Sequence, residues 1–203
     1  MDRRPTFFTS DWHLDHANVI IYSKRPFRDV NHMNRVLINN YNATVPENGI
    51  CWFLGDMGLG SGETIKKALA EMNGTKILVL GNHDKGAEAM YRMGFDAVMY
   101  SASLVIAGKQ VTLSHCPLLG TFREDVTGMK NAQPGANWHG DHKNQMYSMH
   151  DHGQFHLHGH IHSPNSGKSE KILGKQRDVG VDANGYRPVS ISEIESWITK
   201  HGR

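Results

Sequence analysis

The feature that most constrains the fold is a set of five short apolar segments. Aspartate, asparagine or histidine follows each segment, either directly or after a short polar turn. The segments are PTFF (5–8), GICWFLG (49–55), KILVLG (76–81), QVTLS (110–114) and FHLHG (155–159). Segments of this length that are rich in branched and aromatic residues are typical of buried β-strands. We therefore expect five strands with polar side chains at their carboxyl ends.

Helical patterns lie between several of these segments. Asp29 can cap a helix that runs to Tyr41 with apolar residues spaced by three and four positions. A second pattern starts at 61–62 and ends at the Asn73-Gly74 pair. Strands that alternate with helices favour an α/β fold in which the sheet is at least partly parallel. Ligands of such sheets bind beyond the carboxyl ends of the strands, where the polar residues of this chain stand.

The second half of the chain predicts a second sheet and a last helix. Residues 97–115 contain two apolar runs joined by Gly108-Lys109, which indicates a β-hairpin. The segment VGVDANG (179–185) is expected to form a strand and an Asn-Gly turn. Ser190 and Glu193 form a possible capping box for a helix with Ile191, Ile194, Trp197 and Ile198 on its inner face. These features favour a sandwich of two mixed sheets with helices outside.

Length and composition bound the class of protein. A chain of 203 residues fits one domain, residues 1–203. It has no apolar run of the ~20 residues that a membrane span needs, and its beginning lacks the apolar core of a secretory signal, so we expect a cytoplasmic protein with no membrane partner. Cys51 and Cys116 lie in apolar runs, which indicates buried thiols rather than a disulfide. Residues 117–153 have little periodicity and predict a flap or insertion loop over the strand ends.

Histidine is concentrated in one part of the chain, because eight of the fourteen lie between residues 139 and 162. Together with the strand-end residues, the candidate metal ligands are Asp11, His13, Asp56, Asn82, His115, His160 and His162. Mixed imidazole, carboxylate and amide ligands suit Mn, Fe, Ni, Co or Zn better than Ca or Mg. Seven ligands are too many for one ion, but sharing one carboxylate divides them into two sets of four. Two divalent ions would outweigh the two carboxylates, so the centre would attract anions and suit displacement at phosphorus.

The order of these motifs carries a resemblance. Asp11-x-His13, Gly55-Asp56, Gly81-Asn82-His83-Asp84, His115 and Gly159-His160-x-His162 are similar to the motifs of the calcineurin-like metallophosphoesterase superfamily. Each motif is weak alone, whereas five in order at successive strand ends are specific. The resemblance extends from Phe7 to GYRPVS (185–190), a segment similar to that of small bacterial and phage-type members. It implies a four-layer αββα sandwich of two mixed sheets flanked by helices, with a metal site at the strand carboxyl ends.

The resemblance also implies a role for each residue. Asp11, His13 and His162 would hold one metal, Asn82, His115 and His160 would hold the second, and Asp56 would bridge them. His83 would be catalytic and not a ligand, because it would face the scissile phosphate and stabilise charge or protonate the leaving oxygen. Asp84 would orient His83. No residue is assigned to the rest of the substrate: Asp15 and His16 are more simply surface residues, although His16 could contact substrate.

The implied activity is that of a metal-dependent phosphoric ester hydrolase. It would hydrolyse a phosphodiester or phosphomonoester of a nucleotide or another small molecule, by attack of a metal-bound hydroxide on phosphorus. Manganese is the expected metal, with Fe, Ni, Co and Zn as alternatives. The G-D-x-H-G and G-D-x-V-D-R-G patterns of protein Ser/Thr phosphatases are absent, which disfavours a phosphoprotein substrate.

Two alternatives remain open. A nuclease acting on DNA or RNA could use the same centre, although a net charge of +2 without a run of basic residues weighs against extended contacts with nucleic acid. A non-catalytic metal-binding module is the alternative from another class. The oligomeric state does not follow from the sequence.

The segment FHLHGHIHS (155–163) is expected to divide its four histidines between two tasks. His156 and His158 would share one face of a strand, and Gly159 would let the chain turn so that His160 and His162 reach different metals. His158 matches the L-H-G-H form of similar small members and would be buried or lie behind the ligands, and His156 would be a strand residue with a hydrogen-bond partner.

Overall fold

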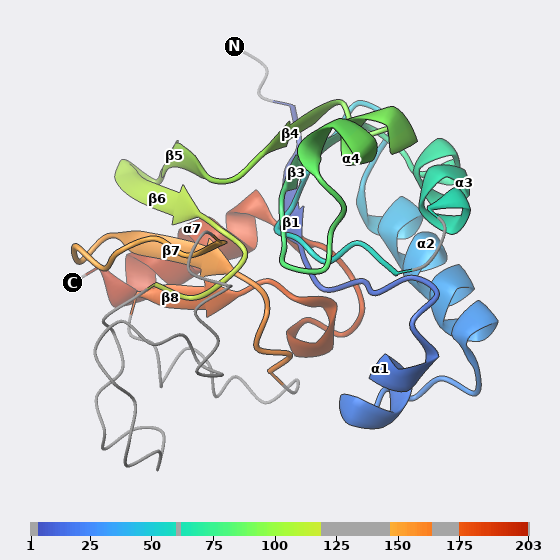
Figure 1. Ribbon diagram of the computed structural model, residues 1–203. Coiled ribbons are helices and arrows are strands. Elements are labelled where there is room, and N and C mark those ends of the chain that lie inside the picture. The colour runs from blue at the N-terminus through green and yellow to red at the C-terminus, as the bar shows by residue number, and fades with distance from the viewer. Residues whose placement is uncertain (1–3, 60–61, 119–146, 164–174, 203) are drawn as a thin grey trace.

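The structure is a computed structural model that describes residues 4–59, 62–118, 147–163 and 175–202. Its described part contains two mixed β-sheets with helices (Figure 1). Most of residues 117–153, the expected flap, lie outside the described residues. No helix in the described ranges is long and apolar enough to cross a membrane.

The first sheet has five strands in the order β4-β3-β2-β1-β9. Their bounds are Thr6–Thr9 for β1, Ile50–Phe53 for β2, Thr75–Val79 for β3, Ala97–Met99 for β4 and Val189–Ser190 for β9. Strands β1 to β4 are parallel and only β9 is antiparallel. The carboxyl ends of β1, β2 and β3 therefore meet at one edge of the sheet, as the apolar segments predict.

The second sheet has four strands in the order β5-β6-β7-β8. These are Ala102–Ile106, Lys109–Leu113, Phe155–His158 and Gln176–Asp178. The β5-β6 pair is an antiparallel hairpin, and β6, β7 and β8 run parallel. The hairpin turn is at Ala107-Gly108, both with positive φ, and not at Gly108-Lys109 as predicted, because β6 begins at Lys109.

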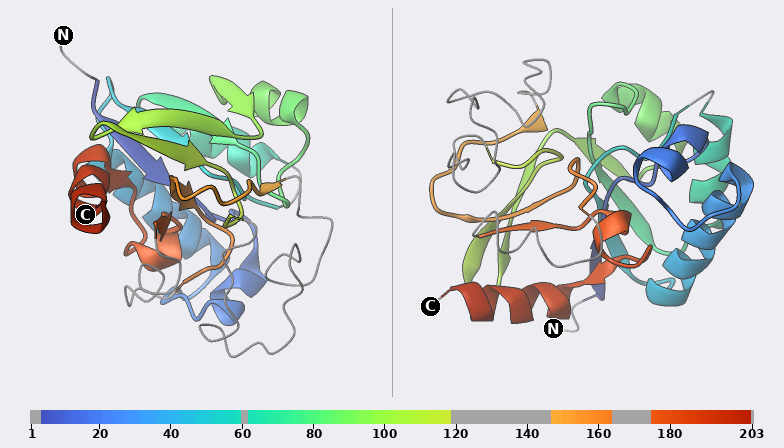
Figure 2. Two further views of the ribbon diagram at one scale, coloured as in Figure 1. Left: turned by 90° about the vertical axis from the view of Figure 1, so that its left-hand side faces the viewer. Right: turned by 90° about the horizontal axis from the view of Figure 1, so that it is seen from below.

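Helices cover the face of the first sheet that is turned away from the second (Figures 1 and 2). They are α2 (Val30–Thr44), α3 (Glu63–Glu71) and α4 (Ala87–Met93), while the short α1 (Ala17–Tyr22) lies beyond the end of β1. The Asp29 side chain accepts from His32 N at 2.7 Å, so the predicted cap of α2 is confirmed. Helix α7 (Ile191–His201) begins with the predicted capping box of Ser190 and Glu193.

Two apolar cores hold these parts together. One packs the first sheet against α2, α3 and α4, with Phe53, Tyr41 and Ile65 fully or almost fully buried. The other lies between the two sheets and takes in Ile194, Trp197 and Ile198 of α7. The Trp197 ring meets the Phe155 ring edge-on at 5.2 Å. The second core therefore joins both sheets and α7.

The segment after β8 differs from the expected strand at 179–185. Strand β8 ends at Asp178, and Val181–Ala183 forms a 3-10 turn, η2. Val181 N donates to Ser10 O at 3.0 Å, so this turn is tied to the end of β1. The turn therefore adds Asp182 to the region where the candidate ligands gather.

Candidate metal centre

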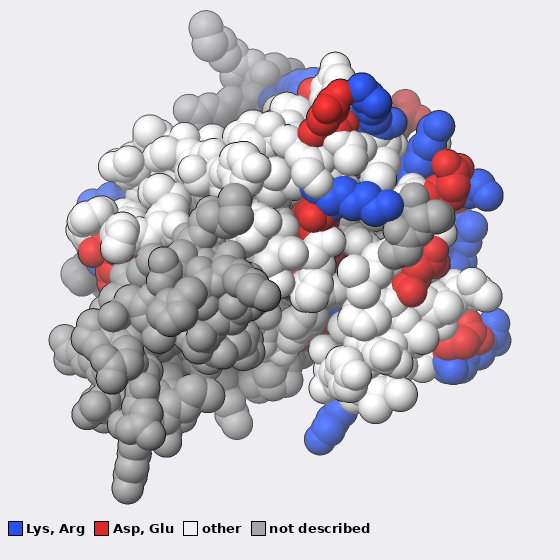
Figure 3. All heavy atoms as spheres, in the orientation of Figure 1, with Lys and Arg blue, Asp and Glu red and all other residues white. Residues whose placement is uncertain are grey.

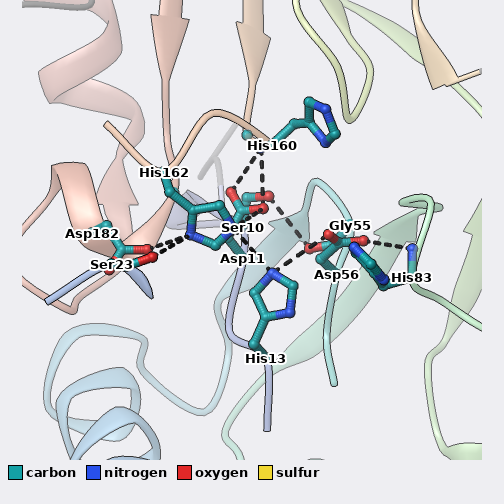
Figure 4. Close-up of polar contacts among 12 residues, drawn as sticks. Ser10, Asp11, His13, Ser23, Gly55, Asp56, His83, His160, His162 and Asp182 are labelled. Atoms are coloured by element: carbon teal, nitrogen blue, oxygen red, sulfur yellow. Dashed lines mark hydrogen bonds and ion pairs between the residues drawn. The ribbon is translucent and has the colours of Figure 1, made fainter. Parts of the chain in front are cut away.

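The loops that follow β1 and β2 run side by side and carry Asp11, His13 and Asp56. Asp11 N donates to Gly55 O at 3.1 Å, and His13 N donates to Asp56 O at 3.0 Å. Figure 4 shows these residues pointing toward one another and toward His162, which comes from the loop after β7. Residues that are far apart in the sequence therefore meet because both sheets end here.

The first group of candidate ligands is called the His13 cluster and consists of Asp11, His13 and His162. His13 Nε2 lies 3.2 Å from His162 Nε2, which lies 3.9 Å from Asp11 Oδ1. Asp11 is fully buried and His13 is almost fully buried. One imidazole nitrogen of each histidine and one carboxylate oxygen thus converge on a common point.

The second group is called the His115 cluster and consists of Asn82, His115 and His160. His115 Nε2 lies 2.9 Å from Asn82 Oδ1, and His160 Nδ1 lies 3.1 Å from the same oxygen. The two imidazole nitrogens are 3.2 Å apart. This cluster also gathers two nitrogens and one oxygen.

Asp56 connects the two clusters through one atom. Its Oδ2 lies 3.5 Å from His13 Nε2 and 3.4 Å from His115 Nε2. Its Oδ1 is used differently, because it accepts from His83 N at 2.9 Å. The structure therefore brings all seven candidate ligands together as two triads with one shared carboxylate oxygen.

His83 lies beside the His13 cluster without entering it. Its ring is exposed, and the ring centroid lies 5.6 Å from that of His13. We expected Asp84 to orient His83, but its carboxylate accepts instead from the backbone N–H groups of Gly81, Asp56 and Met57 at 2.8–3.0 Å. The contacts of Asp84 join the loops after β2 and β3 and so fix the position of Asp56.

Backbone strain is concentrated at the candidate ligands. Five of the seven have φ in the left-handed region that side chains rarely adopt: Asp11 (59°), His13 (51°), Asp56 (57°), His160 (72°) and His162 (46°). Such a conformation costs on the order of 1–3 kcal/mol per residue and is kept where the surroundings enforce it, most often at functional sites. The strain turns these side chains toward the clusters.

Glycines allow the carboxylates to come close to neighbouring backbone. A Cβ on Gly81 would lie 2.3 Å from Asp56 Oδ1, and one on Gly159 would lie 2.3 Å from Asp11 Oδ2. A Cβ on Gly55 would lie 2.5 Å from His115 Nδ1. The glycines of the G-D, G-N-H-D and G-H-x-H motifs are thus required by space around the carboxylates and histidines.

The orientation of two candidate ligands is fixed by hydrogen bonds behind them. His115 Nδ1 donates to Leu54 O at 2.7 Å, which leaves Nε2 with the lone pair that faces Asp56 and Asn82. His162 Nδ1 donates to Asp182 Oδ2 at 2.8 Å, which likewise leaves Nε2 free to act as a ligand. Hydrogen bonds of this kind set the tautomer and raise the basicity of metal-binding histidines.

Arg25 holds Asp182 in place, and neither residue was identified from the sequence. Arg25 Nε and Nη2 donate to the two oxygens of Asp182, each at 2.8 Å. Nη2 also donates to Asp11 O at 2.7 Å, and Nη1 donates to Trp12 O at 3.0 Å. A buried arginine thus supports both His162 and the strained backbone at Asp11.

Burial and mutual charge shift the titration of the site. Burial lowers the pKa of His13 to about 3, so its ring is neutral at pH 7 and can act as a ligand. Burial raises the pKa of Asp11 to about 6. Burial alone would raise the pKa of Asp56, but His115 and His13 hold it well below its usual range. The lowered pKa of Asp56 means that positive charge beside its carboxylate is favourable.

Without a metal ion, protonated His115 supplies positive charge beside Asp56. Burial would lower its pKa, but the Asp56 charge outweighs burial and raises the pKa to about 10. A metal ion between His115 Nε2 and Asp56 Oδ2 would supply the same positive charge. The two clusters therefore fit cations. With a metal in place of that proton, the His13 cluster would offer two imidazole nitrogens and a carboxylate, the His115 cluster would offer two imidazole nitrogens and an amide oxygen, and Asp56 would serve both.

Comparison with known proteins finds a relative over almost the whole chain. No family model matches the sequence. The uncharacterized protein MJ1445 of Methanocaldococcus jannaschii is 29% identical over 204 residues, which cover 98% of this chain and 94% of that protein. The similarity to this relative therefore indicates no activity.

Two solved structures are similar to different degrees. The crystal structure of AQ665 from Aquifex aeolicus, a protein of unknown function, has a TM-score of 0.67 at 23% identity and covers 96% of this chain and 99% of that chain. A novel archaeal phosphodiesterase has a TM-score of 0.37 at 16% identity, covering 79% and 74% of the two chains. The first score indicates a shared fold, whereas the second is too low to indicate one.

Proposed function

We propose that the protein is a dinuclear metal-dependent phosphoesterase of the calcineurin-like metallophosphoesterase type. Its substrate would be a phosphodiester or phosphomonoester of a nucleotide or another small molecule. The observation that carries the proposal is the pair of ligand triads that share Asp56 Oδ2, at 3.5 Å from His13 Nε2 and 3.4 Å from His115 Nε2. A phosphoryl group is the substrate that two adjacent divalent cations bind and activate best.

The His13 cluster would hold one ion and the His115 cluster the other, with Asp56 as ligand to both. Manganese is our first choice, and Fe, Ni, Co or Zn would suit the same nitrogen and oxygen ligands. When bound, such ions supply Lewis-acid stabilisation of phosphoryl charge and a nucleophile at neutral pH. The proposal includes an αββα sandwich, with α2, α3 and α4 over the first sheet, while α7 adds its apolar face to the core that the two sheets share.

The chain's own residues would orient the substrate and transfer the proton. Asp182 and Leu54 O orient the rings of His162 and His115 through Nδ1, so that the Nε2 atoms of these two histidines face inward. His83 is exposed beside the His13 cluster, and its backbone is fixed by Asp56 Oδ1. From there its ring could donate a proton to the leaving oxygen or stabilise charge on the phosphoryl group.

A nuclease would use the same metal centre, so the two proposals differ only in the substrate: a small phosphoester or a nucleic-acid strand. On the face shown in Figure 3, described basic and acidic side chains lie next to one another around the helices, with no continuous basic track. This distribution favours a small substrate over a long nucleic-acid strand. Salt-sensitive binding of a single-stranded oligonucleotide would favour the nuclease instead.

The test is manganese-dependent hydrolysis of bis-p-nitrophenyl phosphate by the wild type and by His83→Ala. We expect the wild type to be active and the variant to be about 100-fold slower with unchanged metal content. His150→Ala, which removes another exposed histidine, is the control and should match the wild type. A phosphoester with an alkyl leaving group separates the two roles of His83: a larger loss there indicates proton donation, and an equal loss indicates charge stabilisation.

Two results would overturn the proposal in different ways. Metal binding without hydrolysis of any phosphoester in a broad panel would favour a non-catalytic metal-binding module. Full activity of His83→Ala toward both leaving groups would refute the role of His83 alone.

A further inference from the structure

Helix α1 presents two consecutive apolar side chains to solvent at the rim of the metal centre. Ile21 and Tyr22 are 73% and 74% exposed, more than Tyr91 at 61% and Tyr100 at 49%. The helix contributes only Val19 to the buried core. Single exposed apolar residues are common, so what sets Tyr22 apart is its contact with the rings that lead to the candidate site.

A series of aromatic rings connects this surface to the His13 cluster. The His83 ring lies 5.6 Å from the His13 ring, and the His13 ring lies 5.5 Å from the His16 ring. The Tyr22 ring meets the His16 ring edge-on at 6.4 Å. Two ring-to-ring steps, of 6.4 Å and 5.5 Å between centroids, therefore separate Tyr22 from the candidate ligand His13.

The residue after Tyr22 confirms that α1 borders the centre. Ser23 Oγ lies 3.4 Å from Nδ1 of His162, and Figure 4 shows Ser23 beside His162 and Asp182. Ser23 and Asp182 therefore both contact Nδ1 of His162. The end of α1 thus contacts the His13 cluster, and Tyr22 is the residue directly before this contact.

The charge around α1 suits an anionic ligand with an aromatic part. No acidic residue occurs between His16 and Arg28, whereas Lys24 is exposed next to Ser23. In Figure 3, the part of the surface at the position of α1 carries few charged side chains. A planar group could therefore lie on it without removing charges from water.

We propose that Tyr22 is a stacking surface for the planar aromatic group of the substrate, so that the preferred phosphoesters are those of nucleosides. This inference rests on the proposed function, because it requires the phosphate to lie at the two clusters. Stacking on an exposed aromatic ring recognises the face of any base, so it selects nucleosides as a class without selecting one base.

The experiment compares AMP with ribose 5-phosphate, which carries the same phosphate and sugar without the base. Each is used as a competitive inhibitor of manganese-dependent bis-p-nitrophenyl phosphate hydrolysis, and the binding of each to the manganese-loaded protein is measured separately by calorimetry. The variants are Tyr22→Ala, Tyr22→Phe and, as the matched control, Tyr91→Ala on α4. All are made in the full chain.

We expect the wild type to bind AMP at least about fivefold more tightly than ribose 5-phosphate. Tyr22→Ala should lose this preference with unchanged binding of ribose 5-phosphate, while Tyr22→Phe and Tyr91→Ala should keep it. Equal binding of the two ligands by the wild type, or a preference that survives in Tyr22→Ala, would overturn the inference. An equal loss of both ligands in Tyr22→Ala would also overturn it, because it would indicate that Tyr22 supports the phosphate site. An inactive wild type that binds metal would instead refute the proposed function.

Discussion

Arg25 and Asp182 form a buried ion pair across 157 positions of the sequence, with two hydrogen bonds of 2.8 Å each. The side chains are 0% and 4% exposed. Asp182 uses the same oxygen that faces Arg25 Nη2 to accept from His162 Nδ1. The pair therefore links the stability of the fold to the orientation of one candidate metal ligand.

Asp182→Asn should weaken metal binding in addition to its cost to the fold, since it also leaves the buried Arg25 charge without a carboxylate partner. The amide keeps the shape of the carboxylate but removes the charge that holds the His162 imidazole, and loss of such a partner typically lowers metal affinity about 10–100-fold. Manganese titration of the folded variant, checked by circular dichroism, measures the effect. An unchanged dissociation constant would show that His162 does not need Asp182 to bind metal, or does not bind metal.

Arg25→Met should destabilise the fold itself. It leaves the Asp182 charge buried without its main partner, which costs about 3–5 kcal/mol in comparable cases. The matched control is Arg35→Met, which removes one partner of the Arg35–Glu71 pair, whose side chains are 58% and 47% exposed. That variant should change the free energy of unfolding by less than about 1 kcal/mol. Equal effects in urea unfolding would contradict the assignment.

Gly81→Ala should disturb the shared carboxylate, because the new Cβ would lie 2.3 Å from Asp56 Oδ1 and 2.6 Å from Asp56 N. The variant is expected to bind fewer than two metal ions per chain. Gly86→Ala is the control, since a Cβ there meets nothing within 4 Å. Metal analysis of both proteins after dialysis tests this, and full occupancy in Gly81→Ala would count against a bridging role for Asp56.

His156 should make the fold sensitive to acid. It is fully buried, with Nδ1 2.9 Å from Thr112 Oγ1, and burial lowers its pKa to about 3. Because an unfolded histidine titrates near 6.5, the unfolded state takes up the proton first. The stability is therefore complete above pH 6.5 and is lost as the pH falls toward 3, at up to ~1.4 kcal/mol per unit.

Both proteins are compared in the presence of a metal chelator. Between pH 7.5 and pH 5, the free energy of unfolding of the wild type should fall by ~1–2 kcal/mol more than that of His156→Gln. Urea unfolding at the two pH values measures this difference. The variant should also keep its metal at pH 7.5, because His156 contacts Thr112, Ser114 and Cys116 but none of the candidate ligands. Parallel pH curves for the two proteins would contradict the account.

The strand ends could be predicted from the sequence because buried parallel strands have a recognisable composition and a fixed direction. Asp11, Asp56 and His115 follow such strands, so their meeting is a consequence of the sheets. The roles of His156 and His158 also follow from alternation, and both are confirmed as buried, with hydrogen bonds to Thr112 and to Gly159 O.

Arg25 and Asp182 could not be found in this way. Arg25 lies in a loop and Asp182 in a segment that resembles a strand, and their contact depends on how η2 docks against the end of β1. The division of 97–106 between two sheets was equally hidden, because β4 and β5 have the same apolar character. The Arg25–Asp182 pair and the division of 97–106 depend on tertiary contacts, which local sequence patterns do not indicate.

The most direct test of the central claim is manganese titration of the wild type and Asp56→Asn, followed by electron paramagnetic resonance of the loaded proteins. We predict two equivalents of manganese in the wild type, with a spectrum of two magnetically coupled ions, because Asp56 Oδ2 lies between both clusters. Asp56→Asn should bind fewer than two and lose the coupling. A single site, or two uncoupled ions unaffected by the substitution, would contradict a shared dinuclear centre.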